Sequence, residues 1–184
     1  LLEAGATVDQ ATTDNGTTPL YIASQNGHVE AVTLLLEAGA AVDQARTDTG
    51  TTPLCIASNQ GLVEAVKMLL DAGAAVNQAT TDTGTTPLYA ASYQGHVEAV
   101  KMLLDAGAAV DQATTDNGTT PLYAASYQEH VEAMKMLLQQ KVPTLSLNLY
   151  SYFTIKITRW AWCCTALQTH QMHLLTRTGA SFKM

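Results

Sequence analysis

Two cysteines and two histidines gather near the carboxyl end of the chain, and four such side chains could hold a metal ion. The stretch CCTALQTHQMH places Cys163, Cys164, His170 and His173 within eleven residues. Thiolate and imidazole are the usual ligands of structural zinc, but zinc sites separate their cysteines by two to four residues. Because these cysteines are adjacent, we interpret the cluster as incidental composition and predict neither a metal nor another cofactor.

Two other motifs with possible chemistry occur in a polar segment that recurs along the chain. NGT at residues 15–17 and 117–119 matches the acceptor sequence for N-glycosylation. The equivalent segments at 49–51 and 83–85 read TGT, which favours a tight turn at all four places. TTDNGTT also lacks the alternating acids and the closing glutamate of a calcium loop. No phosphate-binding glycine loop, nucleophile elbow or convergent carboxylate pair occurs, so the sequence predicts no catalytic residues.

A nine-residue phrase returns four times at a spacing of 34 residues. GTTPLYIAS begins at Gly16, GTTPLCIAS at Gly50, and GTTPLYAAS at both Gly84 and Gly118. Tandem self-similarity of this length is typical of repeat proteins, whose core lies between neighbouring copies.

Each unit contains the signals for two short helices and a projecting loop. Thr86 is a favourable N-cap, Pro87 suits the first helical position, and Gly95 can end the helix in the left-handed conformation. A second helix is predicted over residues 97–105, with apolar residues at helical spacing. Neither helix is long enough to be stable alone in water, so the units must stack.

The complete phrase, G-T-TPLY-x-A-S-x-x-GH-VEAV-x-x-LL-x-AGA, resembles the ankyrin repeat over residues 1–138. The resemblance implies an all-α helical repeat solenoid with projecting hairpin loops, made of the end of one repeat and four further units. Two features depart from the family pattern, which has a period of 33 and the signature T-P-L-H-x-A. The period here is 34, and the signature histidine is replaced by Tyr21, Cys55, Tyr89 and Tyr123. In the family this histidine ties turns together by hydrogen bonds, a role open to a tyrosine hydroxyl but poorly suited to Cys55.

Two further positions test the resemblance. His28, His96 and His130 stand where the family pattern itself has histidine, and we interpret them as helix caps. Glu129 occupies the place of the cap glycines Gly27, Gly61 and Gly95. It must therefore either adopt the strained left-handed conformation or re-route the turn.

Charge and composition separate the array from a non-repeat tail at residues 139–184. Residues 1–138 carry sixteen acids and four bases, a net charge of 4 − 16 = −12, whereas the tail carries five bases and no acid. An acidic array repels phosphate backbones, which excludes nucleic acid as its partner. Residues 145–158 alternate like a strand but have no sheet to join, and charged residues rule out a membrane span there. We expect the tail to be disordered or poorly folded.

The resemblance implies a function in recognition rather than catalysis. We predict a monomeric scaffold that binds another protein, through a basic or polar segment, on a concave face of loop tips and first helices. With three cysteines and no signal peptide, the chain is expected in the reducing cytoplasm. Two alternatives stay open: the array regulates a larger enzyme whose catalytic domain precedes Leu1, or its tail anchors it to a membrane.

The predicted protein-binding residues are those that the repeat scaffold leaves free to vary. Four aspartates at the loop tips should form a negative stripe, and two tyrosines beside it offer large rigid contact surfaces. The set is Asp14, Asn15, Gln25, Asn26, Asp48, Asn59, Gln60, Asp82, Tyr93, Gln94, Asp116, Tyr127 and Gln128, with the adjacent tip residues Thr17, Thr49, Thr51, Thr83, Thr85, Asn117 and Thr119.

Overall fold

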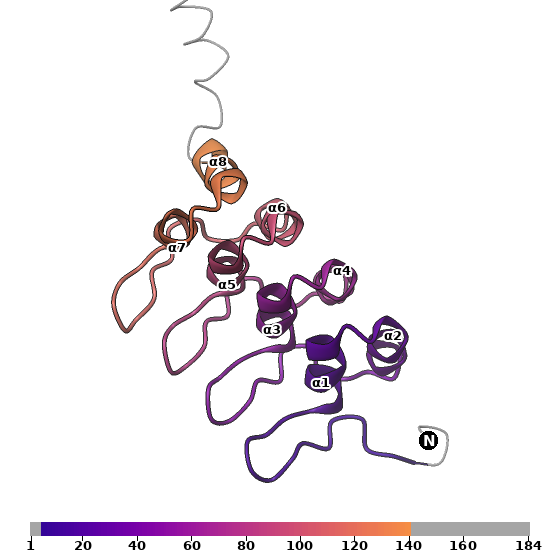
Figure 1. Ribbon diagram of the computed structural model, residues 1–184. Helices are drawn as coiled ribbons and strands as arrows, with labels where there is room; N and C mark the ends of the chain where they lie inside the picture. Colours follow the sequence, from indigo (N-terminus) through magenta and orange to yellow (C-terminus); the bar gives the residue numbers. More distant parts are fainter. Residues whose placement is uncertain (1–4, 141–184) are drawn as a thin grey trace, which may run out of the picture. The chain divides into compact units, whose positions relative to one another are not determined.

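The structure, a computed structural model, describes residues 5–140, and all regular secondary structure in that range is helical. Eight helices form four pairs, and a hairpin loop precedes each pair (Figure 1). We call each hairpin with the pair that follows it a repeat, numbered 1 to 4. The first helices are α1 (Pro19–Asn26), α3 (Pro53–Gln60), α5 (Pro87–Gln94) and α7 (Pro121–Tyr127). The second helices are α2 (Val29–Glu37), α4 (Val63–Asp71), α6 (Val97–Asp105) and α8 (Val131–Gln140). The predicted all-α repeat architecture is confirmed.

Every first helix begins in the predicted way. The hydroxyl of its N-cap threonine accepts a hydrogen bond from the backbone N–H three residues on, as from Thr86 Oγ1 to Tyr89 N at 3.1 Å. Thr18, Thr52 and Thr120 repeat this bond, and a proline fills the first helical position each time. Threonine and proline therefore fix the start of each first helix at equivalent places in all four repeats.

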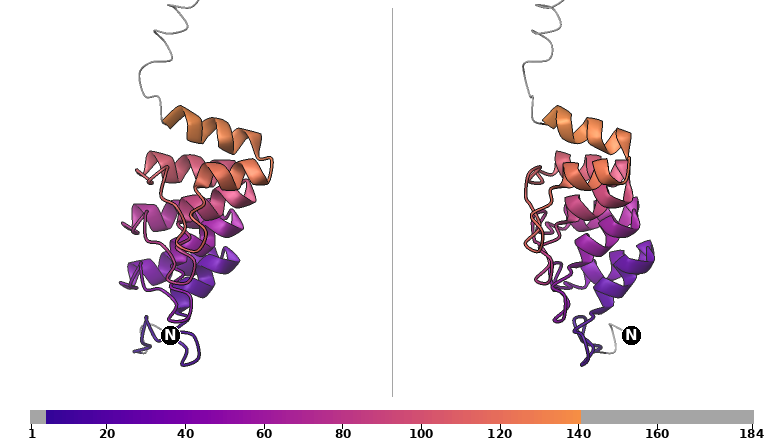
Figure 2. Two further views of the ribbon diagram at one scale, coloured as in Figure 1. Left: turned by 90° about the vertical axis from the view of Figure 1, so that its left-hand side faces the viewer. Right: turned by 60° about the vertical axis from the view of Figure 1, so that its left-hand side comes forward.

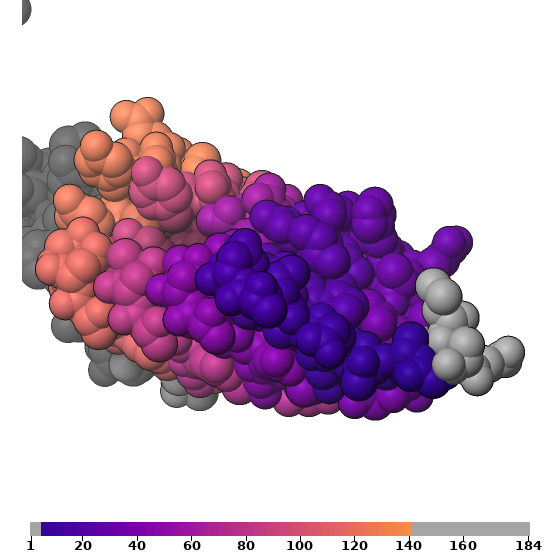
Figure 3. Space-filling model, turned by 90° about the horizontal axis from the view of Figure 1, so that it is seen from below, coloured from indigo at the N-terminus to yellow at the C-terminus, as the bar shows by residue number. Residues whose placement is uncertain are grey.

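The helix pairs stack in sequence order, and the core lies between neighbouring pairs (Figure 2). Each first helix packs against the first helix of the next repeat, and the second helices α2, α4, α6 and α8 do the same. Fully buried leucines and valines recur at the period of the repeat: Leu20, Leu54 and Leu88; Val32, Val66 and Val100; Leu69, Leu103 and Leu137. Because each repeat contacts its neighbours, the space-filling surface forms bands in sequence order (Figure 3).

The hairpin loops are joined tip to tip. Thr47 N donates to Asn15 O at 2.9 Å, Thr81 N donates to Thr49 O at 2.8 Å, and Thr115 N donates to Thr83 O at 2.8 Å. This close approach requires glycine in the earlier hairpin. A Cβ atom on Gly50, whose φ is 70°, would lie 2.6 Å from the backbone nitrogen of Thr81. The row of hairpins is thus a continuous surface held by backbone bonds.

Glu129 adopts the left-handed conformation with a φ of 60°, so the strained alternative is the correct one. The turn keeps the bond from His130 N to Ala125 O, the equivalent of that from His96 N to Ala91 O, although α7 ends one residue earlier than α5. A side chain at Gly61 would place its Cβ 2.5 Å from His96 Nδ1 of the following repeat. No described helix stacks beyond α8, so the side chain of Glu129 meets no such obstacle.

His28 and His96 occupy the N-cap positions of α2 and α6, where the sequence placed them, but neither side chain makes a cap hydrogen bond. His96 instead bridges two repeats, with Nε2 3.0 Å from Asn59 O and its ring against Gly61. The ring of His130 lies against Gly95 in the same way, whereas the side chain of Leu62 lies against Gly27.

Several predictions lie outside the described residues. These are the metal-like cluster at residues 163–173, the strand pattern at 145–158, and the predicted tail at 139–184 apart from the end of α8. The division of the chain at residue 138 stays a prediction.

Candidate functional site

All thirteen predicted binding residues are at least partly exposed. The four aspartates of this set lie at or beside the hairpin tips, and most of the other residues lie near the ends of the first helices. These two kinds of surface meet in pockets that are lined by a hairpin on one side and by first helices on the other. We call this side of the array, between hairpins and first helices, the groove.

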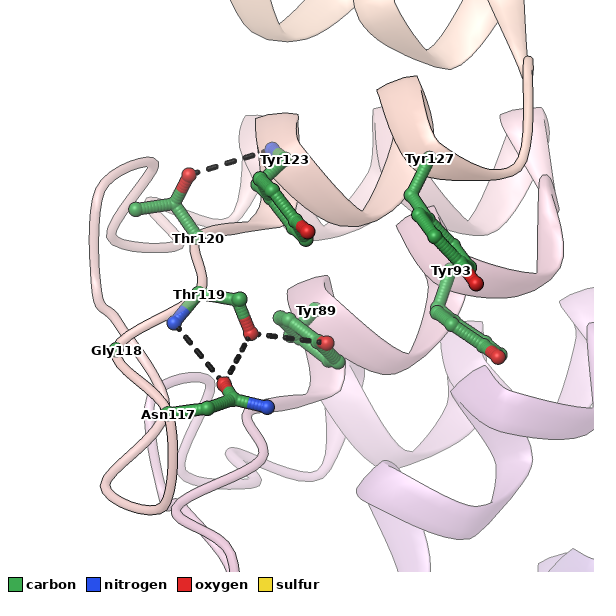
Figure 4. Close-up of a pocket in the computed structure, with 8 residues that line it drawn as sticks. All are labelled: Tyr89, Tyr93, Asn117, Gly118, Thr119, Thr120, Tyr123 and Tyr127. Atoms are coloured by element: carbon green, nitrogen blue, oxygen red, sulfur yellow. Dashed lines mark hydrogen bonds between the residues drawn. The ribbon is translucent and has the colours of Figure 1, made fainter.

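The larger pocket of the groove has a volume of about 720 Å³ and is formed by repeats 3 and 4 (Figure 4). Side chains from α5 and α7 line one side, and the hairpin before α7 lines the other. The lining residues are Tyr89, Tyr93, Asn117, Gly118, Thr119, Thr120, Tyr123 and Tyr127. Half of them are tyrosines, and none is an acid or a base.

The four tyrosines form two stacked pairs, one on each helix. The ring centroids of Tyr89 and Tyr93 lie 6.4 Å apart with an interplanar angle of 11°, and those of Tyr123 and Tyr127 lie 6.3 Å apart at 12°. The pairs arise because residues four apart lie on the same face of a helix. Tyr93 is 37% exposed, Tyr123 56% and Tyr127 69%, so three of the rings are open to solvent.

The hairpin side of the pocket is held by hydrogen bonds. Asn117 Oδ1 accepts from Thr119 Oγ1 at 2.7 Å and from Thr119 N at 3.2 Å. Thr119 Oγ1 in turn lies 3.2 Å from the hydroxyl of Tyr89, which joins repeat 3 to the hairpin of repeat 4. The hydroxyl of Tyr89 thus makes the inter-repeat bond expected of a substitute for the signature histidine.

A second pocket, of about 360 Å³, lies in repeats 1 to 3, and its lining includes the charged residues Arg46 and Asp82. The guanidinium of Arg46 covers the ring of Tyr21 with its Cζ 5.6 Å from the centroid. The same guanidinium donates from Nε to Asp48 Oδ1 at 3.0 Å and from Nη2 to Oδ2. Tyr21 and Cys55 are each only 3% exposed. Tyr21 and Cys55 are the equivalents of Tyr89 and Tyr123, so the groove wall is buried at these positions.

Three of the aspartates at the hairpin tips, Asp14, Asp48 and Asp82, have their charged form stabilised by local hydrogen bonds. Thr12 and Thr80 hydroxyls lower the pKa of Asp14 and Asp82 respectively, and Arg46 lowers the pKa of Asp48. Arg46 also pairs with Asp48, so the negative stripe is neutralised at the second hairpin. Among residues 5–140, Asp14, Asp82 and Asp116 form no salt bridge.

Burial dominates the chemistry of Cys55. Loss of hydration, with a smaller contribution from Asp82, raises the pKa of its thiol to about 12. A thiol with this pKa stays protonated at neutral pH and is a poor nucleophile. Cys55 is therefore a small apolar filler of the groove wall.

The sequence did not reveal that Tyr89 and Tyr123 line the same pocket as Tyr93 and Tyr127. Both were assigned to the scaffold, because they replace the signature histidine. The available signal was the spacing, since Tyr89 and Tyr93, like Tyr123 and Tyr127, are four residues apart and share a helix face. The pairing of Arg46 with Asp48 also had a signal in the sequence, because Arg46 is the only base in any of the four hairpins.

A family model described as ankyrin repeats (3 copies) matches residues 1–80 and 77–148. The chain is a member of the ankyrin repeat family. No curated protein matches its sequence significantly. The family assignment explains the paired helices and projecting hairpins, and ankyrin repeats generally serve as protein–protein interaction modules without catalytic activity.

Neither of two other kinds of site is found among the described residues of this ankyrin protein. No group of three or more histidine, cysteine or acidic residues in that part of the chain could hold a metal ion. None of the helices between residues 5 and 140 has the length and apolar character needed to span a membrane.

Proposed function

We propose that this protein binds a segment of another protein in the groove, and that repeats 3 and 4 supply most of the binding energy. The observation that carries the proposal is the pair of exposed rings, Tyr93 and Tyr127, beside the open tyrosine-lined pocket. Tyrosine is enriched at binding hot spots, because it buries a large area at little cost in conformational entropy.

The charges beside the pocket support a basic or mixed polar partner. Asp82 and Asp116 stand at the tips of the hairpins of repeats 3 and 4 without a salt bridge to any described residue. Carboxylates at an interface rim mainly accelerate the encounter with a positively charged partner. Association should therefore be faster at low salt.

Selection from a random peptide library displayed on phage, with the full chain as bait, tests this proposal. Selected peptides should be rich in lysine or arginine and should bind more slowly as salt is raised. The best test variant combines Tyr93→Asn with Tyr127→Gln, because repeats 2 and 1 carry Asn59 and Gln25 at that position.

The double variant should keep its helical content by circular dichroism and bind the selected peptides about thirtyfold more weakly, the loss typical of a hot spot. Lys67→Ala, a change on the exposed side of α4 and outside the groove, should leave binding unchanged. Peptides that bind the double variant as well as the natural chain would place the site elsewhere.

A further inference from the structure

The tyrosine pocket presents the same aromatic surface twice, once on each of two neighbouring repeats. Tyr89 and Tyr93 form one layer on α5, and Tyr123 and Tyr127 form the next on α7, with nearly equal ring separations. Figure 4 shows Tyr89 and Tyr123 beside the hairpin and Tyr93 and Tyr127 further along the two helices. Packed helices lie about 8–10 Å apart, so the aromatic surface recurs at about that interval along the groove.

The same pocket carries hydrogen-bond donors that have no partner among residues 5–140. Asn117 uses its carbonyl oxygen within the hairpin, and its amide nitrogen points toward α5 in Figure 4. The hydroxyls of Tyr93, Tyr123 and Tyr127 make no bond to any described residue. A ligand that fits this pocket must therefore offer flat apolar groups and hydrogen-bond acceptors together.

We propose that the tyrosine pocket binds a proline-rich segment in the polyproline II conformation, with prolines three residues apart on successive tyrosine layers. This inference rests on the proposed function and names its partner. A polyproline II helix has three residues per turn and rises about 3.1 Å per residue, so equivalent prolines repeat every 9 Å or so. That interval matches the separation of neighbouring repeats.

The backbone of such a segment also matches the donors of the pocket. Polyproline II has no internal hydrogen bonds, and proline has no N–H, so the segment offers many carbonyl acceptors and few donors. The amide of Asn117 and the tyrosine hydroxyls supply the missing donors. The flat proline rings lie against the aromatic faces, the arrangement by which proline-rich segments dock in aromatic-lined grooves.

Other conformations of a bound segment fit less well. An added strand needs an exposed sheet edge, and no strand occurs among residues 5–140. A bound helix keeps its own carbonyls bonded, so it would leave Asn117 and the tyrosine hydroxyls without acceptors. The extended conformation alone satisfies both the rings and the donors.

Charge complementarity extends the proposal beyond the prolines. Asp82 lines the neighbouring pocket of the groove, and Asp116 precedes Asn117 at the next hairpin tip. A basic residue flanking the prolines would therefore lie near an unpaired carboxylate. The ligand is a proline-rich segment with prolines three apart and lysine or arginine at its ends.

Fluorescence anisotropy with the full chain and synthetic twelve-residue peptides tests this inference. The first peptide has prolines at every third position, a lysine at each end and alanine elsewhere. The second has the same composition with the prolines two residues apart, which places them out of register with the repeats. The third replaces the lysines of the first by glutamates.

The first peptide should bind at least about tenfold more tightly than either of the others. Combining Tyr93→Asn with Tyr127→Gln should weaken it about thirtyfold. Asn117→Thr should weaken its binding about threefold to tenfold, because the change removes the amide donor. Threonine suits this hairpin position, since repeats 2 and 3 carry Thr49 and Thr83 there. Unfolding midpoints in urea identify any variant that is merely unfolded.

Equal binding of the first two peptides, or binding of the first that survives the double tyrosine variant, would overturn the inference. It would also fail if library-selected peptides without proline bound through the tyrosines while the first peptide did not. That last result would leave the proposed function intact. Failure of every selected peptide to depend on the tyrosines would instead refute the proposed function itself.

Discussion

Repeats 1 and 2 have the same backbone as repeats 3 and 4 but form a different groove. In repeats 1 and 2 Arg46 lies over Tyr21 and Cys55 is buried, so the wall offers no exposed aromatic ring. In repeats 3 and 4 it is an open pocket lined by tyrosines on α5 and α7. The N-caps and the proline starts are the same in both halves, and each half buries leucines from first and second helices.

The difference comes from a few positions on each first helix and its hairpin. Repeats 1 and 2 carry Gln25 and Asn59 where repeats 3 and 4 carry Tyr93 and Tyr127. Arg46 has threonine equivalents in the other three hairpins. Because the helices do not change, the comparison separates residues that build the scaffold from residues that determine what the groove can bind.

If both halves share one scaffold, equivalent core leucines should contribute equally to the free energy of unfolding in each half. Leu54 and Leu88 are 0% and 1% exposed and lie at the same place in α3 and α5. Leu54→Ala and Leu88→Ala should each lower the free energy of unfolding by about 2–5 kcal/mol, measured by urea denaturation. A large difference between the two values would mean that the halves do not share one packing arrangement.

Moving the aromatic surface into the other half should extend the binding site. Ile56→Ala together with Asn59→Tyr gives α3 the residues that α5 carries at these positions. With the tyrosine layer continued into repeat 2, a peptide long enough to span three repeats should bind about tenfold more tightly, or about 1.4 kcal/mol. Titration calorimetry measures this, and Ile56→Ala alone serves as the control. An unchanged affinity would show that the ring at this position does not contribute.

The last repeat differs from the others in its strained cap, and relieving that strain should stabilise it. Glu129 has a φ of 60°, a value at which a side chain costs about 1 kcal/mol and glycine costs nothing. Glu129→Gly should raise the free energy of unfolding by about 1 kcal/mol in urea. Gln128→Gly is the matched control, since Gln128 has a φ of −92° and no strain to relieve. A Glu129→Gly variant less stable than the natural chain would contradict the assignment of strain.

The smallest expected effect concerns the ion pair of repeats 1 and 2. Arg46 holds the pKa of Asp48 below its ordinary value of 3.8 in the folded protein. A pKa lowered by folding adds stability above the unfolded pKa and loses it as the pH falls through the folded pKa. The Arg46→Thr variant should therefore have a slightly lower free energy of unfolding than the natural chain near pH 6. That difference in free energy should shrink below about pH 4. Urea midpoints across that range measure it, and a difference that grows in acid would have the wrong sign.

The sequence was sufficient to predict the scaffold, because local rules repeat four times. Threonine followed by proline fixed the helix starts, and the period of 34 residues fixed the order of stacking. At Glu129 the replaced glycine left two alternatives, a strained cap or a re-routed turn, and the structure has the first. These inferences depend on neighbours in the chain or on equivalent positions in the next repeat.

Inferences that depend on contacts across the groove could not be made in this way. Arg46 lies over the ring of Tyr21 in the preceding repeat, and His96 bonds to the backbone of Asn59 in the preceding repeat. Tyr89 was assigned to the scaffold and is also part of the pocket. Each outcome depends on side-chain directions between repeats, which the period alone does not give.

The central claim is that a partner segment lies on the tyrosine layers of repeats 3 and 4. Two-dimensional amide NMR of the full chain, during titration with the tightest peptide from the library, tests it most directly. We expect the largest shift changes in α5, α7 and the hairpin at residues 114–120, with little change in α2 and α4. Changes concentrated in those second helices, or in repeat 1 alone, would contradict the account.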